Sequence, residues 1–349
     1  MVERKIHILI LTPGFPSDES DSSCIPPLQE FLINFKSRFT LTKFTIIALQ
    51  YPSQNKIYYW HGIQIVSLAG NNKSLTKPYL WYKTLQRAKK INNFEPVTLV
   101  HSLWLGECAL IGNILSNKFG CPHICTLMGQ DVRHSNRYLR LLQNKNIKIV
   151  AISKTQSDQF NKITKKNVNK IIHWGINDQL VNNIVRDIEL LAVGSLIPLK
   201  NYALLITLVE KISSIKKEIK CKLVGSGPEA IKLKQMVSDK KVKSNIEFTG
   251  QLSRTEIFML MQRSKVFVHP SKFEGSGFVF TEALVNGMNI VSFNVGCARS
   301  HPKWFIAEDE EDFIHITKKL ITSKLDFIPV NLFPLSETVE QYASLYGIE

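Results

Sequence analysis

The sequence predicts an α/β fold made of two doubly wound domains, each a parallel sheet with helices on both faces. Short apolar runs alternate with stretches of helical apolar spacing from end to end, which is the pattern of parallel strands joined by helices. This rhythm breaks over residues 174–186, which are polar and weakly periodic, and it restarts at Leu190. The chain has 349 residues, a length that at roughly 150 residues a domain also predicts two domains.

In the first half, we interpret each short apolar run as a buried strand and each stretch with apolar residues three and four apart as a helix. Pro26 and Pro27 precede a stripe formed by Leu28, Phe31 and Phe35, and proline is tolerated in the first turn of a helix. The expected strands are 6–11, 44–49, 63–66, 97–100, 123–127 and 147–152. The expected helices are 26–39, 79–92, 106–118, 132–145 and 155–164.

The second half repeats the alternation. The expected strands are 190–193, 222–224, 246–249, 266–269 and 289–293, and the expected helices are 201–213, 228–238, 254–262 and 278–287. A last helix is expected over residues 336–346, where Val339, Tyr342 and Ala343 have helical spacing. We therefore expect one domain over residues 1–173 and another over residues 187–332.

Composition and charge narrow the class of protein. Apolar residues make up 44% of the chain and charged residues 21%, which excludes a disordered chain, a collagen and a small disulfide-stapled domain. The formal charge is +15, which favours anionic partners: nucleic acid, an anionic membrane face or phosphorylated substrates. No apolar run approaches the roughly 18 residues of a membrane span, and the first residues do not resemble a signal peptide. We expect a cytoplasmic protein.

The six cysteines are scattered. The one cluster, Cys121-Pro-His-Ile-Cys125, is not followed by a second ligand pair at the spacing of a zinc site, so we interpret it as part of a core strand. No metal site and no cofactor are expected.

Three segments combine a strand end, glycine and a helix start, which is where doubly wound sheets bind ligands. They are residues 194–200, which end in a lysine, residues 225–228 (Gly-Ser-Gly-Pro), and residues 266–282, in which Glu274 and Glu282 flank a glycine loop and a helix start. Glycine there lets backbone N–H groups reach a phosphate, and lysine is a natural counter-ion for it. The two carboxylates can accept hydrogen bonds from sugar hydroxyls. Taken singly, each segment also has a plain structural interpretation. Residues 194–200 can end in a solvated surface lysine, residues 225–228 can form an ordinary turn, and residues 266–282 can form a helix with an acid near its amino end.

In this order, the three segments resemble the C-terminal domain of the family 4 glycosyltransferases, also called group 1 glycosyltransferases. The likeness is closest over residues 270–283, which fit the family's Pro-Ser-x-x-Glu-Gly-x-Gly pattern with a second Glu-Ala eight residues after the first glutamate. It is weaker over residues 1–172, where Gly129-Gln-Asp131 is similar to the family's His-Gly-x-Asp.

The resemblance implies a GT-B fold, in which two Rossmann-like domains face each other across a donor cleft, with the C-terminal helix 333–349 packing back on the first domain. It also implies transfer of a sugar from a nucleotide-sugar, with retention of configuration and without an essential metal. Glu274 and Lys200 are then the expected catalytic residues, with Glu274 on the transferred sugar and Lys200 on the leaving diphosphate. Glu282 is expected on the ribose. The remaining donor-binding residues that the resemblance implies are Ser195, Gly225, Gly227, Phe248, Thr249, Gly250, Leu252, Gly275, Ser276, Gly277 and Phe278, and the acceptor-side residues are Gly14, Gly129 and Asp131.

The sequence departs from the family pattern at three places. Ser195 stands where the family usually has an arginine, so one of two diphosphate cations is missing, and Arg254 or Arg299 is a candidate substitute. Met128 stands where a histidine often contacts the donor sugar. Residues 22–24 (Ser-Ser-Cys) replace the glycine pair after the first strand. These departures keep open an inactive protein that only binds nucleotide-sugar.

Basic side chains gather in the first half. Lys83, Arg87 and Lys90 share one face of a predicted helix, with Tyr79 and Tyr82 among their apolar neighbours. Such a face fits an anionic membrane surface and a lipid-linked acceptor, and it equally fits a solvated surface. We expect a glycosyltransferase of cell-surface polysaccharide or lipid-linked glycan synthesis, at the inner face of the cytoplasmic membrane. The spacing of the two glutamates disfavours a nucleotide-sugar epimerase. Apart from the positive charge, the sequence has no motif that indicates a nucleic-acid-binding protein.

Overall fold

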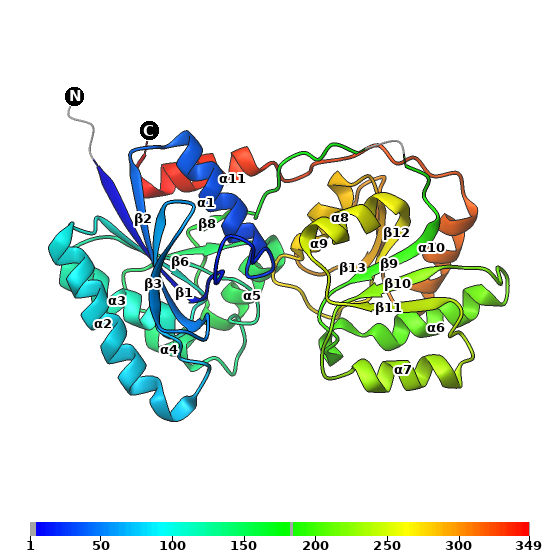
Figure 1. The fold of residues 1–349 in the computed structure, drawn as a ribbon, viewed down its shortest axis with the longest axis horizontal. Coiled ribbons are helices and arrows are strands. Elements are labelled where there is room, and N and C mark those ends of the chain that lie inside the picture. Colours follow the sequence, from blue (N-terminus) through cyan, green and yellow to red (C-terminus); the bar gives the residue numbers. More distant parts are fainter. Residues whose placement is uncertain (1–4, 182–183, 349) are drawn as a thin grey trace. The chain divides into compact units, whose positions relative to one another are not determined.

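A computed structural model describes residues 5–181 and 184–348 (Figure 1). The chain forms two compact units: unit 1 comprises residues 1–175 and 335–349, and unit 2 comprises residues 176–334. Each unit is a largely parallel sheet with helices packed on its faces, so the predicted α/β class is confirmed.

The sheet of unit 1 has the strand order β3-β4-β2-β1-β5-β6-β7-β8, and each neighbouring pair is parallel except β3 with β4. Its strands are β1 (Ile6–Gly14), β2 (Thr42–Tyr51), β3 (Lys56–Trp60), β4 (Ile63–Ser67), β5 (Leu99–Leu103), β6 (His123–Thr126), β7 (Lys148–Ala151) and β8 (Lys170–Ile171). Its helices are α1 (Pro26–Arg38), α2 (Lys77–Phe94), α3 (Glu107–Phe119), α4 (Arg137–Leu142), α5 (Lys154–Thr164) and α11 (Leu335–Tyr346), with a short 3-10 turn η1 (Ser74–Thr76) before α2.

The sheet of unit 2 has the order β11-β10-β9-β12-β13-β14 and is parallel throughout. Its strands are β9 (Ile188–Val193), β10 (Cys221–Val224), β11 (Ile246–Gly250), β12 (Ser264–His269), β13 (Asn289–Phe293) and β14 (Trp304–Ala307). Its helices are α6 (Tyr202–Ser213), α7 (Ala230–Asp239), α8 (Arg254–Arg263), α9 (Phe278–Val285) and α10 (Glu310–Thr322), and a 3-10 turn η2 (Pro198–Lys200) precedes α6. The strand order reverses at β9, so the loops after β9, β10 and β12 lie at the position where such sheets bind ligands.

The C-terminal helix α11 completes the core of unit 1. The ring of Tyr342 stacks on Trp174 with 5.8 Å between centroids and lies 5.0 Å from the ring of Phe31 on α1. Tyr346 is joined through its hydroxyl to Nδ1 of His101 on β5, at 2.8 Å. Because these aromatic side chains are buried, the helix is an integral part of the unit rather than an appended tail.

The helix expected over residues 132–145 was wrong, because only α4 forms there. The Asn136 side chain accepts a hydrogen bond from the Tyr138 N–H at 3.0 Å and donates to the carbonyl of Leu105 at 2.7 Å. This side chain caps a helix that begins at residue 137, while the preceding segment turns instead of coiling. Strands β3, β8 and β14 and helix α10 were not anticipated.

Within the part of the chain that the structure describes, every helix is too short or too polar to cross a membrane.

Candidate active site

Three loops of unit 2 meet at the carboxyl edge of its sheet, after β9, β10 and β11. The Gly194 N–H donates to the carbonyl of Val224 at 3.0 Å, and the Gly225 N–H donates to the carbonyl of Gly250 at 2.8 Å. Gly225 has a φ of 139°, and a Cβ there would lie 2.0 Å from the carbonyl oxygen of Gly194. This position therefore requires glycine for the close approach of two backbones, and the same argument holds for Gly227 against Leu196.

The loop between β12 and α9 brings a carboxylate against a lysine and a histidine. Nε2 of His269, the last residue of β12, lies 2.7 Å from Oε1 of Glu274. The ammonium of Lys200 in η2 donates to the same oxygen. A backbone hydrogen bond holds the loop after β12 against η2, since the Lys272 N–H donates to the carbonyl of Leu199 at 3.0 Å. Both expected catalytic residues thus lie in one cluster with His269.

Burial and charge set the protonation states in this cluster. Burial lowers the pKa of His269, so at neutral pH its uncharged ring donates Nε2–H to Glu274 and leaves Nδ1 as the acceptor nitrogen. Burial alone would raise the pKa of Glu274, but the hydrogen bond from His269 and the charge of nearby Lys200 lower it to about 2. Glu274 is therefore ionised. Its second oxygen, Oε2, accepts no hydrogen bond from residues 5–181 or 184–348 and is available to a ligand.

Helix α9 begins directly after the glycine loop. Gly277 precedes it with a φ of 73°, and a Cβ there would lie 2.5 Å from the Phe280 ring. No side chain of the described residues caps this helix start. The preceding residues Gly275 and Ser276 are buried, and the Ser276 carbonyl accepts the Cys297 N–H at 2.8 Å. The amino end of α9 thus presents the backbone dipole of an uncapped helix beside Glu274.

Glu282 lies within α9 and is paired with an arginine that the sequence did not pair with it. Nε of Arg254, at the start of α8, lies 2.9 Å from Oε1 of Glu282, and both side chains are largely buried. The guanidinium lies over the rings of Phe258 and Phe278, at 5.0 and 5.6 Å from their centroids. A cation therefore lies at the amino end of α9, next to the expected ribose-binding carboxylate.

The remaining donor-side residues are distributed along the same edge. Ser195 is exposed in the loop after β9. Phe248 packs partly on the core beneath α7, with Nζ of Lys234 5.8 Å from its ring centroid, so much of this ring is used in packing. Thr249 donates to the carbonyl of Gly250, and Leu252 packs on the core around Phe280. Arg299, the other candidate substitute for the missing arginine, lies over Phe333.

On the side of unit 1, Asp131 has a structural role that the sequence did not indicate. Its carboxylate accepts the backbone N–H groups of Leu105, Met128 and Gly129 at 2.9, 3.1 and 2.9 Å. Burial nevertheless raises the pKa of this carboxyl. Asp131 therefore ties the loop after β6 to the loop after β5. Gly14, the last residue of β1, packs beside Tyr51.

A cavity of about 340 Å³ opens at this carboxyl edge of the unit 1 sheet. Glu107, which begins α3, accepts hydrogen bonds from Gln50 at 2.6 Å and from the Trp81 indole at 2.9 Å, and Gln50, Trp104 and Asp131 line the same cavity. Gln50, Trp104 and Glu107 were missed, although each lies at a strand end or helix start, the signal used elsewhere.

The start of α1 offers little to an anion. Pro26 and Pro27 have no N–H, and the N–H groups of Leu28 and Gln29 both donate to the carbonyl of Ile25. Asp21 occupies the preceding loop and accepts the N–H of Cys24 at 3.2 Å. The segment that replaces the glycine pair is therefore closed on itself. Residues 5–181 and 184–348 hold no group of three His, Cys, Asp or Glu side chains placed to bind a metal ion.

Comparison with known proteins gives consistent matches. An uncharacterized glycosyltransferase of Methanocaldococcus jannaschii is 28% identical over 214 residues, which cover 60% of this chain and 59% of that protein. The gpi3 subunit of phosphatidylinositol N-acetylglucosaminyltransferase of Schizosaccharomyces pombe is 28% identical over 131 residues, which cover 36% of this chain and 29% of that protein. The match thus spans little more than half of the first relative and less of the second.

Among solved structures, HepE from Anabaena in complex with UDP and glucose superposes with a TM-score of 0.76 at 17% identity, over 98% of this chain and 99% of that one. The chain has two Rossmann-like units and superposes over nearly its whole length on this structure, which defines a GT-B fold. Residues 178–303, within unit 2, match the family described as glycosyl transferases group 1. This part of the chain is thus similar to the group 1 glycosyltransferases, and the fold of the whole chain agrees with that likeness.

Proposed function

We propose that this protein transfers a sugar from a uridine diphosphate donor to a hydroxyl group of a glycan or a lipid-linked acceptor, with retention of configuration at the anomeric carbon. The observation that carries the proposal is the buried cluster of Lys200, Glu274 and His269 beside the uncapped amino end of α9. The UDP moiety is supported by the solved relative, whose complex contains UDP and glucose.

In the reaction, the bond between the anomeric carbon and the diphosphate oxygen breaks, and a bond to the acceptor oxygen forms. UDP leaves with the bonding electron pair, and the acceptor hydroxyl gives its proton to the departing diphosphate oxygen. Negative charge grows on the diphosphate as this bond breaks, so a fixed cation and a helix dipole stabilise the transition state more than the ground state. Lys200 and the N–H groups of residues 275–278 supply these groups in our proposal, and no metal is required.

Glu274 binds a hydroxyl of the transferred sugar through Oε2, since Oε1 is occupied by Lys200 and His269. His269 is a positioning residue, because it holds the carboxylate and keeps it ionised. The carboxylate also screens part of the Lys200 charge until a diphosphate competes for that lysine.

Glu282 and Arg254 bind the nucleoside diphosphate in this proposal. Glu282 accepts the ribose hydroxyls, and Arg254 provides the second cation that Ser195 does not. The position of the guanidinium over Phe278, the first residue of α9, supports this assignment. Arg299 is disfavoured because it lies over Phe333 instead.

The acceptor binds in unit 1, where the cavity beside Glu107 and Trp104 offers a carboxylate and an aromatic ring. Both groups suit a hydroxylated ligand. Because the start of α1 has no backbone donor to spare, we assign the whole diphosphate to unit 2. A cytoplasmic location and peripheral contact with a membrane stay predictions.

The experiment measures UDP binding by calorimetry and turnover of UDP-glucose and UDP-N-acetylglucosamine, for the native chain, Glu274→Gln and the surface control Glu247→Gln. We expect Glu274→Gln to bind UDP but to turn over at least about 100-fold more slowly, and the control to behave as the native chain. UDP binding without turnover of any nucleotide-sugar would support the binding-only alternative. Salt-sensitive DNA binding without UDP binding would support the nucleic-acid alternative.

A further inference from the structure

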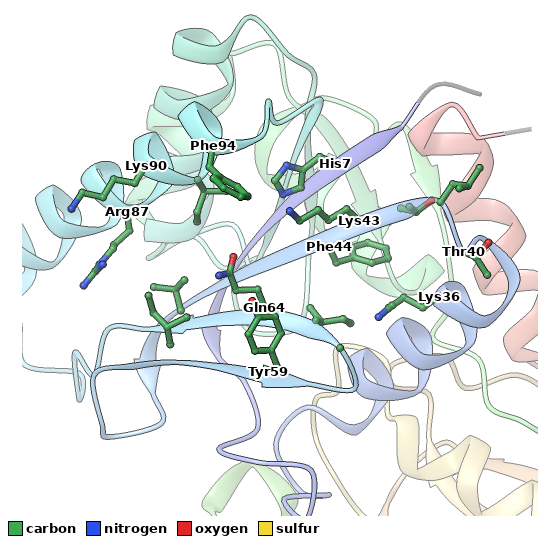
Figure 2. A pocket seen from close by; sticks show the side chains of 17 residues that line it. His7, Lys36, Thr40, Lys43, Phe44, Tyr59, Gln64, Arg87, Lys90 and Phe94 are labelled. Carbon is green, nitrogen blue, oxygen red and sulfur yellow. The ribbon is translucent and has the colours of Figure 1, made fainter. Parts of the chain in front are cut away.

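A second, larger cavity of unit 1 lies at the opposite end of the sheet from the proposed acceptor site. It measures about 680 Å³ and is lined by His7 and Lys43, at the amino ends of β1 and β2, together with Gln64 of β4 (Figure 2). The cavity beside Glu107 is instead lined by Pro13 and Gln50, near the carboxyl ends of β1 and β2. The two cavities are therefore distinct, and glycosyl transfer gives no role to the larger one.

This cavity exists because the sheet extends past the helix that covers it. Helix α2 packs on the central strands through Leu80 and Ala88. Strands β4 and β3 continue beyond it, and in their antiparallel register Tyr59 pairs with Gln64 and Ile57 with Val66. Paired residues share a face of the sheet, so these four side chains form a floor beside the last two turns of α2.

The charge of the lining is positive. Lys36, Lys43, Arg87 and Lys90 line the cavity, and no carboxylate does among the residues that the structure describes. Lys43 is neutralised by Glu95 at 2.5 Å, and Lys36 donates to the carbonyl of His61 at 3.0 Å. Arg87 and Lys90, one turn apart on α2, form no ion pair with residues 5–181 or 184–348. Burial and, to a lesser extent, the charge of Arg87 lower the pKa of the neighbouring Lys83. The side of the cavity formed by α2 therefore offers two cations without ion-pair partners, Arg87 and Lys90, to an anion.

The rim of the cavity is apolar and unusually exposed. Phe94, at the end of α2, is 87% exposed, Tyr59 is 68% exposed and Ile57 is 52% exposed. Phe44 and Ile91 continue the apolar lining inward. In Figure 2, Phe94 lies on the same helix as Arg87 and Lys90, across from Tyr59 on β3. Exposed aromatic side chains around a basic hollow mark a surface that a ligand with an apolar part covers.

We propose that this cavity binds an organic phosphate that carries an apolar chain, with the phosphate between Arg87 and Lys90 and the chain along Phe94, Tyr59 and Ile57. Inorganic phosphate or a sugar phosphate would leave the apolar rim in water. An uncharged lipid would desolvate the two cations without a counter-ion, which is costly. The proposal requires both kinds of lining at once, and it does not depend on glycosyl transfer.

The test uses calorimetry with three probes: dihexanoyl phosphatidic acid as a dissolved monomer, inorganic phosphate, and vesicles of equal parts phosphatidylcholine and phosphatidic acid. Arg87→Gln/Lys90→Gln removes the two cations. Lys89→Gln/Lys118→Gln is the matched control, because it removes the same charge from exposed positions that do not line the cavity. Phe94→Ser/Tyr59→Ser removes the apolar rim. Both rings are exposed, so we expect this variant to keep its fold, which circular dichroism checks.

We expect the dissolved amphiphile to bind more tightly than inorganic phosphate. Loss of the two cations weakens binding roughly 25-fold, at about fivefold for each charge, and the control changes it by less than about twofold. The rim variant also weakens the amphiphile but leaves inorganic phosphate unchanged. Binding to vesicles alone, with the same dependence on the variants, identifies a bilayer as the source of the phosphate, and binding to the monomer identifies a free amphiphile.

Three results would overturn the proposal. The first is absence of binding to both the monomer and the vesicles. The second is an equal loss in the control variant, which indicates general attraction to a basic surface. The third is inorganic phosphate binding as tightly as the amphiphile, which removes the apolar part from the interaction.

Discussion

Replacing Lys200 by methionine tests the cluster on which the proposed function rests. Methionine keeps an unbranched apolar side chain and removes the charge. The side chains of Lys200 and Glu274 are 16% and 13% exposed, so the pair is shielded from water and its loss is not compensated by solvent. We expect the variant to lose both conformational stability and turnover, since Glu274 keeps only His269 as a hydrogen-bond donor among the described residues.

The size of the effect follows from the carboxyl pKa. Burial acts to raise it, and the bonds to His269 and Lys200 outweigh burial, so it falls from an ordinary 4.5 to about 2. At ~1.4 kcal/mol per pKa unit, the two partners stabilise the fold by ~3 kcal/mol at neutral pH. Because the folded pKa is the lower one, this stabilisation is present above pH 4.5 and is lost as the pH falls toward 2. Because His269 contributes the larger share of this shift, losing Lys200 should cost about 1 kcal/mol of it, together with two to three orders of magnitude in turnover.

The assay combines urea unfolding with turnover of a UDP-sugar for Lys200→Met, the double variant Lys200→Met/Glu274→Gln and the surface control Lys243→Met. In the double variant the carboxylate charge is gone as well, so stability should recover while turnover stays low. If Lys200→Met unfolds and turns over as the native chain does, another cation holds the diphosphate and our interpretation of the cluster is wrong.

Three further outcomes are expected. Glu282→Ala and Arg254→Ala should each weaken UDP binding by about 2–3 kcal/mol in calorimetry, because each leaves a buried polar group without its partner, and unchanged affinity in both would remove this pair from the site. Turnover should survive EDTA, and loss on chelation that Mg²⁺ restores would contradict the metal-independent mechanism. Burial lowers the pKa of His123 from 6.5 to about 3, so the unfolded chain binds more protons than the folded chain between these pH values. The free energy of unfolding should therefore decrease as the pH is lowered, by ~1.4 kcal/mol per pH unit for this residue. His123→Gln should reduce that slope in urea unfolding between pH 6.5 and pH 5, and an unchanged slope would show that the native ring is protonated.

Sequence spacing was enough to anticipate the repeated strand–helix pattern and to single out the segment around Glu274. Local signals carried both, since a buried strand, a glycine loop and a helix start follow one another along the chain. The pair of Glu282 with Arg254 could not be assigned in the same way, although Arg254 was a candidate cation. It depends on α8 packing beside α9, and nothing in the spacing of the two residues fixes that contact.

The roles of His269 and of helix α10 could have been predicted from local sequence patterns. His269 ends a predicted strand five residues before Glu274, and a buried polar side chain at such a place needs a partner. Asp309, which caps α10 by accepting the Asp312 N–H at 2.8 Å, is followed by Phe313, Ile314 and Leu320 at helical spacing. The basic face of α2 with Arg87 and Lys90 had a local signal, but the cavity itself did not, because the rest of its lining comes from α1 and four strands that only the folded sheet brings together.

The packing of α11 has a consequence for how the chain acquires its structure during synthesis. Unit 2 is continuous in sequence, so all of its strands can emerge from the ribosome and pair before α11 is made. The core of unit 1 is incomplete at that stage, because Tyr342 and Tyr346 belong to it and follow unit 2 in the sequence. Until then, Phe31 and Trp174 lack the aromatic neighbour they share, and a hydrophobic face stays open to chaperones. Unit 1, which begins before unit 2 in the sequence, is therefore completed after it.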